Sequence, residues 1–483
     1  MRTVSSPSLT TDLKPYPAYK DSGVLWLGEI PEHWEVLPSR ALFTEIKERD
    51  HPEEQMLSVT ITKGVVLQQA LLADSSKKDS SNQDKSAYKL VRPGDIVYNK
   101  MRAWQGAIGT SNYKGIVSPA YVVQRPRDGI RSRFYHYMLR TPAFAKEAER
   151  WSYGITSDMW SLRPEHFKMI YVCLTPLPEQ AAIVRFLDHV DRRIRRYIRA
   201  KQKLIKLLEE QKQAIIHRAV TRGLDPNVRL KPSGVEWLGD VPEHWEVVPL
   251  RRRWRVTDCK HLTVPFTADG FLLVSVREVQ SFDLQLSGAK RTSAEWYSLL
   301  TEGGRTPKRG DIIFCRNVSV GSAAFVNTDI PIAMGQDVCL IRSAFQNQRF
   351  LNYYLHSGAM RCQLELLRVG STFDRINVAK IKNLTIIVPP RAEQDAIVAH
   401  IDACVEALDN AALSIKQEVT FLREYRTRLI ADVVTGKLDV RRAAARLPIA
   451  EEEPEPSEEI DTLTEEEEGM DAELDGTSEE AEA

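Results

Sequence analysis

Apolar residues recur at alternating spacings of four and three in two long stretches of the chain, one starting at Ile183 and the other at Ile397. A period of 3.5 residues held over several heptads is typical of an α-helix that packs against another helix in a coiled coil. Lys201, Gln211 and Glu418 are the polar interruptions. The predicted seam positions are Ile183, Leu187, Val190, Ile194, Leu204, Leu208 and Ile215 in the first stretch, and Ile397, Ile401, Leu408, Ile415, Leu422 and Leu429 in the second.

Each of these helices needs a partner, because a single helix of this length would leave an apolar stripe exposed. The other copy is the obvious partner. We expect the two to pair antiparallel about a pseudo-twofold axis, with Ile183 near Leu429 and Leu204 near Leu408. The pairing predicts a rod with one globular domain at each end, roughly 50 Å long between Ile183 and Ile215 at 1.5 Å per residue.

The chain is an internal duplication. The string SGVLWLGEIPEHWEVLP at Ser22–Pro38 matches SGVEWLGDVPEHWEVVP at Ser233–Pro249 at thirteen of seventeen positions. Further along, a Gly-Asp-Ile at 94–96 recurs at 310–312, and a Glu-Gln at 179–180 recurs at 393–394. Each half is therefore the same series: a lead-in, a globular segment of about 140 residues and a long helix.

The globular segments combine short alternating apolar runs with turn signals and a few helices. In both halves a turn at Gly-Asp precedes a β-branched strand. Between the halves, the sequence agrees at structural positions and differs almost everywhere else. We therefore predict an α+β protein, in which two similar mixed α/β domains carry different surfaces and are joined by the antiparallel coiled coil.

The net charge of zero conceals an uneven distribution. Residues 451–483 contain seventeen Asp and Glu and no Lys or Arg, which leaves 66 basic against 49 acidic residues in 1–450. A basic body is expected of a protein that binds a polyanion. The acidic segment 451–483, called the tail below, cannot bury enough apolar area to fold, so we expect it to be disordered. It either screens the basic body against non-specific DNA or only keeps the chain in solution.

The sequence contains none of the common catalytic signatures: no GxxxxGK[ST], HExxH, GxSxG or NPP[YF]. Its six cysteines lack a CxxC pair, which favours small buried side chains over disulfides or a zinc knuckle. His33 and His244 recur in the PEHW string, but each is a single histidine, so a turn residue beside a packed tryptophan is favoured over a metal ligand.

Neither a signal peptide nor an apolar span is evident, and we expect a cytoplasmic protein.

The sequence closely resembles the specificity subunits of type I restriction-modification systems. The resemblance rests on the two SGVxWLGxxPEHWEV lead-ins, the two GDI strands, PLPEQAAIV at 176–184 with its copy at 389–398, and VTGKLDVR at 434–441. It covers about residues 15–441. It implies a non-catalytic subunit with two target-recognition domains, each reading half of a bipartite DNA site. The lead-ins and helices would bind two methyltransferase subunits, to which motor-nuclease subunits are added. S-adenosylmethionine, ATP and Mg²⁺ would belong to these partners.

On this resemblance we divide the chain into seven parts. They are an N-terminal lead-in (1–38), a first target-recognition domain (39–175), a central coiled-coil helix (176–222), a second lead-in (223–249), a second target-recognition domain (250–388), a C-terminal coiled-coil helix (389–441) and a disordered acidic C-terminal part (442–483), which contains the tail.

The predicted DNA-contacting residues are polar or basic positions where the halves share backbone but differ in side chain. They follow the GDI strand or occupy the loop GITSDMWSLRPEHF and its copy. Arginine and asparagine make bidentate contacts to guanine and adenine edges, and a helix N-terminus can hold a phosphate. The candidates are Asn99, Lys100, Arg102, Ser157 and Arg163 in the first half, and Arg316, Asn317, Ser319, Ser371, Thr372, Arg375 and Asn377 in the second. The alternative is a helical scaffold protein that does not read DNA sequence.

Overall fold

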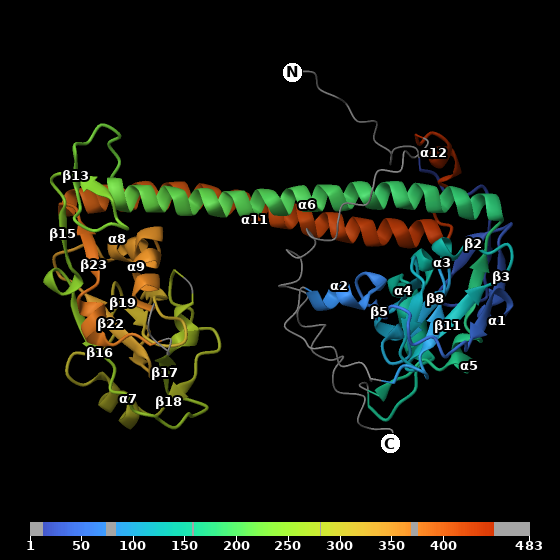
Figure 1. Cartoon of the computed structure of the whole chain (residues 1–483), viewed down its shortest axis with the longest axis horizontal. Coiled ribbons are helices and arrows are strands. Elements are labelled where there is room, and N and C mark those ends of the chain that lie inside the picture. Colours follow the sequence, from blue (N-terminus) through green and yellow to red (C-terminus); the bar gives the residue numbers. More distant parts are fainter. Residues whose placement is uncertain (1–12, 74–83, 157–158, 281, 369–374, 449–483) are drawn as a thin grey trace. The chain divides into compact units, whose positions relative to one another are not determined.

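The computed structural model describes residues 13–73, 84–156, 159–280, 282–368 and 375–448 (Figure 1). The chain forms two compact units. The first contains 1–202 and 417–483, and the second contains 203–416. The division passes through both long helices, α6 (Leu177–Arg222) and α11 (Arg391–Val434), so each unit holds one part of each. Among the described residues, no helix is both long and apolar enough to cross a membrane.

The first unit is built on a four-stranded antiparallel sheet in the order β4-β11-β8-β9. All four residues of strand β8 are buried, and three of them are hydrophobic, because both faces of the strand are covered. Ile96 and Tyr98 face a core shared with the helices, whereas Val97 faces a smaller core shared with a β-hairpin. The strands are β4 (Phe43–Ile46), β8 (Ile96–Asn99), β9 (Ile108–Thr110) and β11 (Tyr121–Pro126), and the smaller pairs are β5 (Leu57–Thr60) with β6 (Gly64–Leu67) and β7 (Lys89–Val91) with β10 (Gly115–Val117).

The second unit repeats this sheet in the order β16-β22-β19-β20. Its central strand β19 is again buried on both faces, with Ile312 and Phe314 toward the helices and Ile313 toward a second core. The strands are β16 (Arg255–Asp258), β19 (Ile312–Cys315), β20 (Ala323–Phe325) and β22 (Val338–Arg342); the added sheet, which differs from the first unit, is β18 (Arg291–Thr292), β17 (Phe271–Val274) and β21 (Ile332–Met334).

The helices and lead-ins are also duplicated. The first unit has α1 (Ser39–Leu42), α2 (Gln68–Ala73), η1 (Ala103–Gln105), α3 (Ser132–Met138), α4 (Pro142–Arg150), α5 (Pro164–Phe167) and α12 (Arg441–Ala445). The predicted start of disorder at residue 442 is wrong, because α12 lies there and buries Ala443 and Ala444. The second has η3 (Leu250–Arg252), η4 (Val276–Val279), α7 (Ala294–Thr301), α8 (Gln348–Leu355), α9 (Gly358–Arg368) and α10 (Val378–Lys382). The lead-in strand pairs are β1 (Tyr19–Asp21) with β2 (Glu29–Pro31), β3 (Glu35–Pro38) with β12 (Tyr171–Leu174), β13 (Leu230–Pro232) with β14 (Asp240–Pro242), and β15 (Glu246–Pro249) with β23 (Thr385–Val388).

Within each unit α6 and α11 run antiparallel. In the first unit, Asp191 pairs with Arg426 and Lys201 Nζ lies 2.6 Å from Glu418 Oε2, so rising numbers on α6 meet falling numbers on α11. In the second, Lys212 Nζ lies 2.8 Å from Asp409 Oδ1. The two helices therefore pair as an antiparallel coiled coil, as the heptad pattern predicts.

The seam positions differ in depth. Ile183, Leu187, Ile194, Ile397, Ile401, Ile415 and Leu429 are buried; Val190, Leu208, Ile215, Leu408 and Leu422 are half-buried; and Leu204 is 41% exposed. The register differs from the expected one. The ion pair of Asp191 with Arg426 puts Val434, rather than Leu429, opposite Ile183, although all three apolar residues belong to one large core. Likewise, the ion pair of Lys212 with Asp409 puts residues near 416, rather than Leu408, opposite Leu204, so both expected pairings are wrong. Antiparallel register cannot be fixed from spacing alone, since a shift by one heptad preserves the apolar stripe.

Candidate nucleic-acid interface

Two loops that are far apart in the sequence meet at the end of the central strand in each unit. In the first unit the residue after β8, Lys100, accepts a hydrogen bond from Leu162 N at 2.8 Å and donates one to Ala120 O at 3.3 Å. In the second unit Arg316, after β19, does the same with Ile376 N and Asp337 O, both at 2.8 Å. The two stretches of predicted DNA-contacting residues thus form one surface in each unit.

The first unit presents three of its predicted residues at this surface. Arg163 is exposed at the N-cap of α5, and Lys100 and Arg102 are half-buried. Arg102 Nη1 lies 3.5 Å from Gln105 Oε1. Asn99 is 6% exposed, and its Oδ1 accepts a hydrogen bond from Met101 N at 2.9 Å, so the side chain holds the loop backbone. Ser157 lies outside the described residues.

Aromatic and apolar side chains that the sequence analysis did not select surround this loop. Trp104 and Trp160 form an edge-to-face pair with ring centroids 5.5 Å apart, joining the two stretches. Tyr153 and Ile155, in the second stretch, are 74% and 91% exposed. Large exposed apolar side chains beside basic residues are suited to contact base edges or thymine methyl groups.

Lys89 is a further cation that the sequence analysis missed. It is 8% exposed, and its Nζ donates hydrogen bonds to the carbonyls of Pro119 and Tyr121, which carry the loop preceding β11. Burial, assisted by the nearby charge of Lys100, lowers the pKa of Lys89 to about 8. A lysine donating to backbone carbonyls gives no sequence signal, because its partners are thirty or more residues away.

In the second unit Arg316 is 5% exposed and lies beneath the surface. Its guanidinium forms an ion pair with Asp258, and its Nη1 lies 3.0 Å from His261 Nε2. Its Nε donates to Ile376 O at 3.4 Å. These bonds connect β16, β19 and the loop before α10, so Arg316 positions the loops in this structure. Direct contact of Arg316 with a base stays a prediction.

The remaining predicted residues of the second unit lie around Arg316. Asn317 forms a β-bridge with Arg375, which is 53% exposed by its side chain. Ser319 is half-buried, and its Oγ lies 3.3 Å from Gln280 Nε2. Asn377 is exposed and caps α10 through a hydrogen bond from Lys380 N at 2.8 Å. Ser371 and Thr372 lie outside the described residues.

Three non-glycine residues in this surface have left-handed backbones. His261, Val318 and Asp337 have φ of 53°, 63° and 64°. A left-handed backbone is unusual for a β-branched residue such as Val318, whose side chain is also 72% exposed. Such strain persists where the surrounding structure enforces it, often at binding sites.

Asp258, Cys259 and His261 bring three potential metal-ligand atoms within 4.8 Å of one another. The Arg316 guanidinium occupies Asp258 and contacts His261 Nε2. Its fixed positive charge opposes a metal cation at this point. We therefore regard the three residues as part of the Arg316 network.

A second duplicated cluster lies at the start of each long helix. Glu179 on α6 accepts hydrogen bonds from Trp34 Nε1 at 3.1 Å and Tyr16 Oη at 2.6 Å, and its Oε2 lies 2.8 Å from His33 Nε2. Burial and the bond to Glu179 raise the pKa of Tyr16. In the second unit Glu393 contacts Trp245 Nε1 at 3.0 Å and His244 Nε2 at 2.8 Å.

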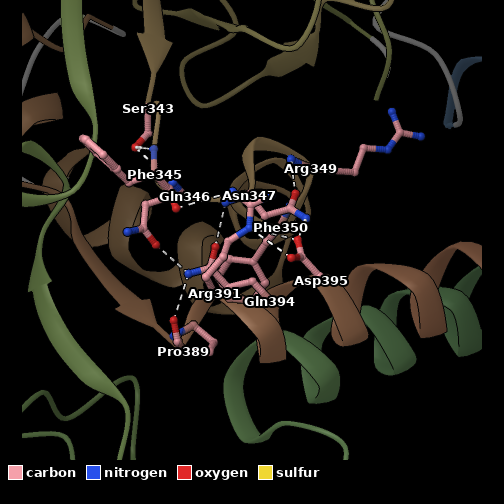
Figure 2. Close-up of polar contacts among 10 residues, drawn as sticks. All are labelled: Ser343, Phe345, Gln346, Asn347, Arg349, Phe350, Pro389, Arg391, Gln394 and Asp395. Carbon is pink, nitrogen blue, oxygen red and sulfur yellow. Dashed lines mark hydrogen bonds and ion pairs between the residues drawn. The ribbon is translucent and has the colours of Figure 1, made fainter.

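The glutamine after each of these glutamates ties the helix to the globular domain. Gln180 Oε1 accepts from Arg131 N at 2.9 Å, and Gln180 Nε2 donates to Thr175 O at 2.7 Å. Figure 2 shows the second copy, in which Gln394 bonds Asn347 N at 2.8 Å and Pro389 O at 2.8 Å. The repeated PEHW and Glu-Gln strings therefore join lead-in, helix and domain in each unit.

Comparisons with known proteins agree with this arrangement. The family model described as the type I restriction modification DNA specificity domain matches residues 288–420. The type I restriction enzyme MjaVIII specificity subunit of Methanocaldococcus jannaschii is 24% identical over 379 residues, covering 74% of this chain and 83% of the relative. The type I restriction enzyme StySPI specificity subunit of Salmonella potsdam is 21% identical over 437 residues, covering 85% of this chain and 90% of the relative.

The fold has a solved counterpart as well. A chain from a structural study of complex assembly and conformational transition of the type I restriction-modification system aligns with a TM-score of 0.64 and 16% identity, covering 84% of this chain and 98% of that one. Over most of its length, the chain is similar to type I specificity subunits.

The specificity-domain match spans most of the second unit's candidate interface. It includes Arg316 with its neighbours, the loop before α10 and the Glu-Gln pair at the start of α11. The first unit carries the same sheet order and the same helix-start contacts. Because the two curated relatives cover 74% and 85% of this chain, the similarity includes residues of both halves.

Proposed function

We propose that this chain is the DNA-recognition subunit of a type I restriction-modification complex, in which each unit reads one half of a bipartite site. The observation that carries the proposal is the duplicated strand end. The same backbone contacts converge there in both units but display different side chains: Lys100, Arg102 and Arg163 in one, and Asn317 and Arg375 in the other.

Recognition would combine a positioning shell with exposed readers. Arg316, Asn99 and Lys89 bond to the loop backbone or, for Arg316, also to the half-buried carboxylate of Asp258, and so fix the loops. The arginines and the asparagine at the surface, which are exposed or half-buried, can then donate to base edges in the major groove or to phosphates. Preorganised loops reduce the entropy lost on binding, which favours affinity and selectivity.

We further propose that the chain itself performs no catalysis. S-adenosylmethionine, ATP and Mg²⁺ would be used by methyltransferase and motor-nuclease partners that this chain directs to the site. Two methyltransferase subunits, one for each half, suit the duplicated lead-ins and helices.

The test is binding of the purified chain with its methyltransferase to duplex DNA, together with sequencing of methylated positions in the source genome. We expect a salt-dependent complex that persists in random competitor DNA, and a split methylated motif with an unread spacer. A helical scaffold without sequence reading would give no selective complex. Methylation by the chain alone would refute the non-catalytic assignment.

A further inference from the structure

One face of α6 in the first unit carries a row of arginines. At 100° per residue, Arg185, Arg192, Arg196 and Arg199 lie within about 60° of one another. The residues that face α11, such as Ile194 and Ile198, lie on the opposite side of the helix and are buried. We call Arg185, Arg192, Arg196 and Arg199 the basic stripe.

Two members of the stripe, Arg192 and Arg199, are available to a charged ligand. Arg192 is exposed and Arg199 half-buried, and among the described residues neither has an ion-pair partner. Asp191, the acidic residue next to Arg192, is already paired with Arg195 and Arg426 on other faces. Burial, with the nearby charges of Arg193 and Arg192, lowers the pKa of His189, which is consistent with a positive local potential.

The C-terminal segment reaches α6 at the first residue of this stripe. Helix α12 is followed by Leu447 and Pro448, and Arg185 Nη2 donates to their carbonyls at 2.6 and 3.2 Å. The tail begins three residues later, and its first nine residues, 451–459, include six glutamates.

The distances suit a contact within one chain. From Arg185 to Arg199 the helix rises about 21 Å, which roughly seven extended residues span. The tail has 33 residues, so its length exceeds this requirement. Single surface ion pairs are weak, but a tethered segment of many like charges has an effective concentration in the millimolar range.

We propose that the acidic tail binds the basic stripe of α6 in the same chain and competes there with nucleic-acid phosphates. The contact lowers non-specific association of the basic first unit with DNA. Binding to a specific DNA site is less affected, because that site also contacts residues of the chain outside the stripe. The contact itself is independent of the proposed sequence reading.

Arginine modification of the full-length protein by phenylglyoxal, followed by mass spectrometry, tests the contact without DNA. The comparison chain has all seventeen acidic residues of 451–483 replaced by the corresponding amides. With the natural tail we expect Arg192 and Arg199 to react several-fold more slowly at low salt, and this difference to vanish near 0.5 M salt because the charges are screened. Arg127, an exposed arginine elsewhere in the unit, is the internal control. Equal rates at Arg192 and Arg199 in both chains would overturn the proposal.

A double-mutant cycle tests the competition. We expect the amide tail to raise affinity for random duplex DNA in the natural chain but not in a chain carrying Arg192→Ala and Arg199→Ala. The matched control, Arg127→Ala with Lys146→Ala, removes two exposed charges from the same unit and should keep the tail effect. If the amide tail and the two arginine substitutions change the affinity for random DNA additively, the tail acts elsewhere or another ligand occupies the stripe. Either result rejects the proposal.

Discussion

The indole Nε1 of Trp34 donates a hydrogen bond to Glu179 Oε1 at 3.1 Å, joining the first lead-in to the start of a helix that lies 145 residues further along the chain. Glu179 also accepts from Tyr16 and contacts His33, and its side chain is only 5% exposed. Glu393 repeats the contact with Trp245 but is 29% exposed by its side chain.

Glu179→Ala should therefore destabilise the first unit by about 1–3 kcal/mol, because buried donors lose their acceptor. Glu393→Ala in the second unit should have a smaller effect, since water can replace the lost carboxylate. Hydrogen exchange of the lead-in amides, followed separately in the two units, measures both. Equal protection losses in the two variants would contradict this ranking.

Gly436, just after α11, should not tolerate a side chain. Its φ is +78°, and a Cβ there would lie 2.3 Å from Pro31 Cδ and 3.1 Å from Trp34 Cζ3. We expect Gly436→Ala to cost about 1–2 kcal/mol for the left-handed backbone and a further 1–3 kcal/mol for the clash. Gly28→Ala is the matched control, because Gly28 has φ +63° and open space around its Cβ position. Denaturant unfolding of both variants separates the two costs, and similar losses would show that packing at Gly436 is unimportant.

The lowered pKa of the buried Lys89 should make the stability of the first unit depend on pH. Its folded pKa of about 8 lies below the ordinary lysine value, so between these values the unfolded chain binds more protons than the folded chain. The free energy of unfolding should therefore rise with pH from about 8 toward the ordinary lysine pKa, whereas below pH 8 the full cost of burying the charge remains. Lys89→Met should lack this rise. The measurement is the difference in free energy of unfolding between the natural chain and Lys89→Met at pH 7.5 and at pH 9.5. The same difference at both pH values would show that the pKa of Lys89 is not lowered by burial.

The candidate residues that reach the surface of each unit should contact the bases of separate half-sites. Arg102→Ala with Arg163→Ala should alter the first unit's half of the methylated motif, and Asn317→Ala with Arg375→Ala the other half. Each true base contact should cost about 1–3 kcal/mol and relax one position, whereas a lost phosphate contact weakens all sequences alike. The measurement is the methylated motif, obtained by sequencing the methylated genomic DNA of cells that carry one or the other double substitution. A change in both half-sites from one pair would contradict independent reading.

The architecture could be predicted from the sequence because duplication repeats every structural signal. The seam, the GDI strands and the paired lead-ins each occur twice, so a chance pattern is excluded. The burial of Arg316 could not be predicted, because its partner Asp258 lies 58 residues away on another strand. The exposed Arg163 and Arg375 were selected by the same criterion, residue type at a divergent loop, which does not distinguish a buried from an exposed side chain.

The length of the paired helices α6 and α11 should set the length of the unread spacer between the two half-sites. Because α6 is continuous from one unit into the other, seven added residues lengthen it by roughly 10 Å. The insertions must lie between the two interhelical ion pairs, for example after Leu204 on α6 and after Ile415 on α11, so that both pairs and the seam are preserved. An insertion after Leu408 would instead separate Asp409 from Lys212.

At about 3.4 Å per base pair, this lengthening corresponds to near three base pairs of additional spacer. The half-site bases should not change, because neither insertion touches a recognition surface. Three base pairs also rotate the DNA by about 100°, so reduced affinity should accompany the shift. The measurement is the methylated motif produced by the extended chain with its methyltransferase, and the control carries the same heptad in α6 alone, which misaligns the two ion pairs and should impair assembly. If the doubly extended chain assembles and methylates at the original spacer, this helix pair does not set the distance between half-sites.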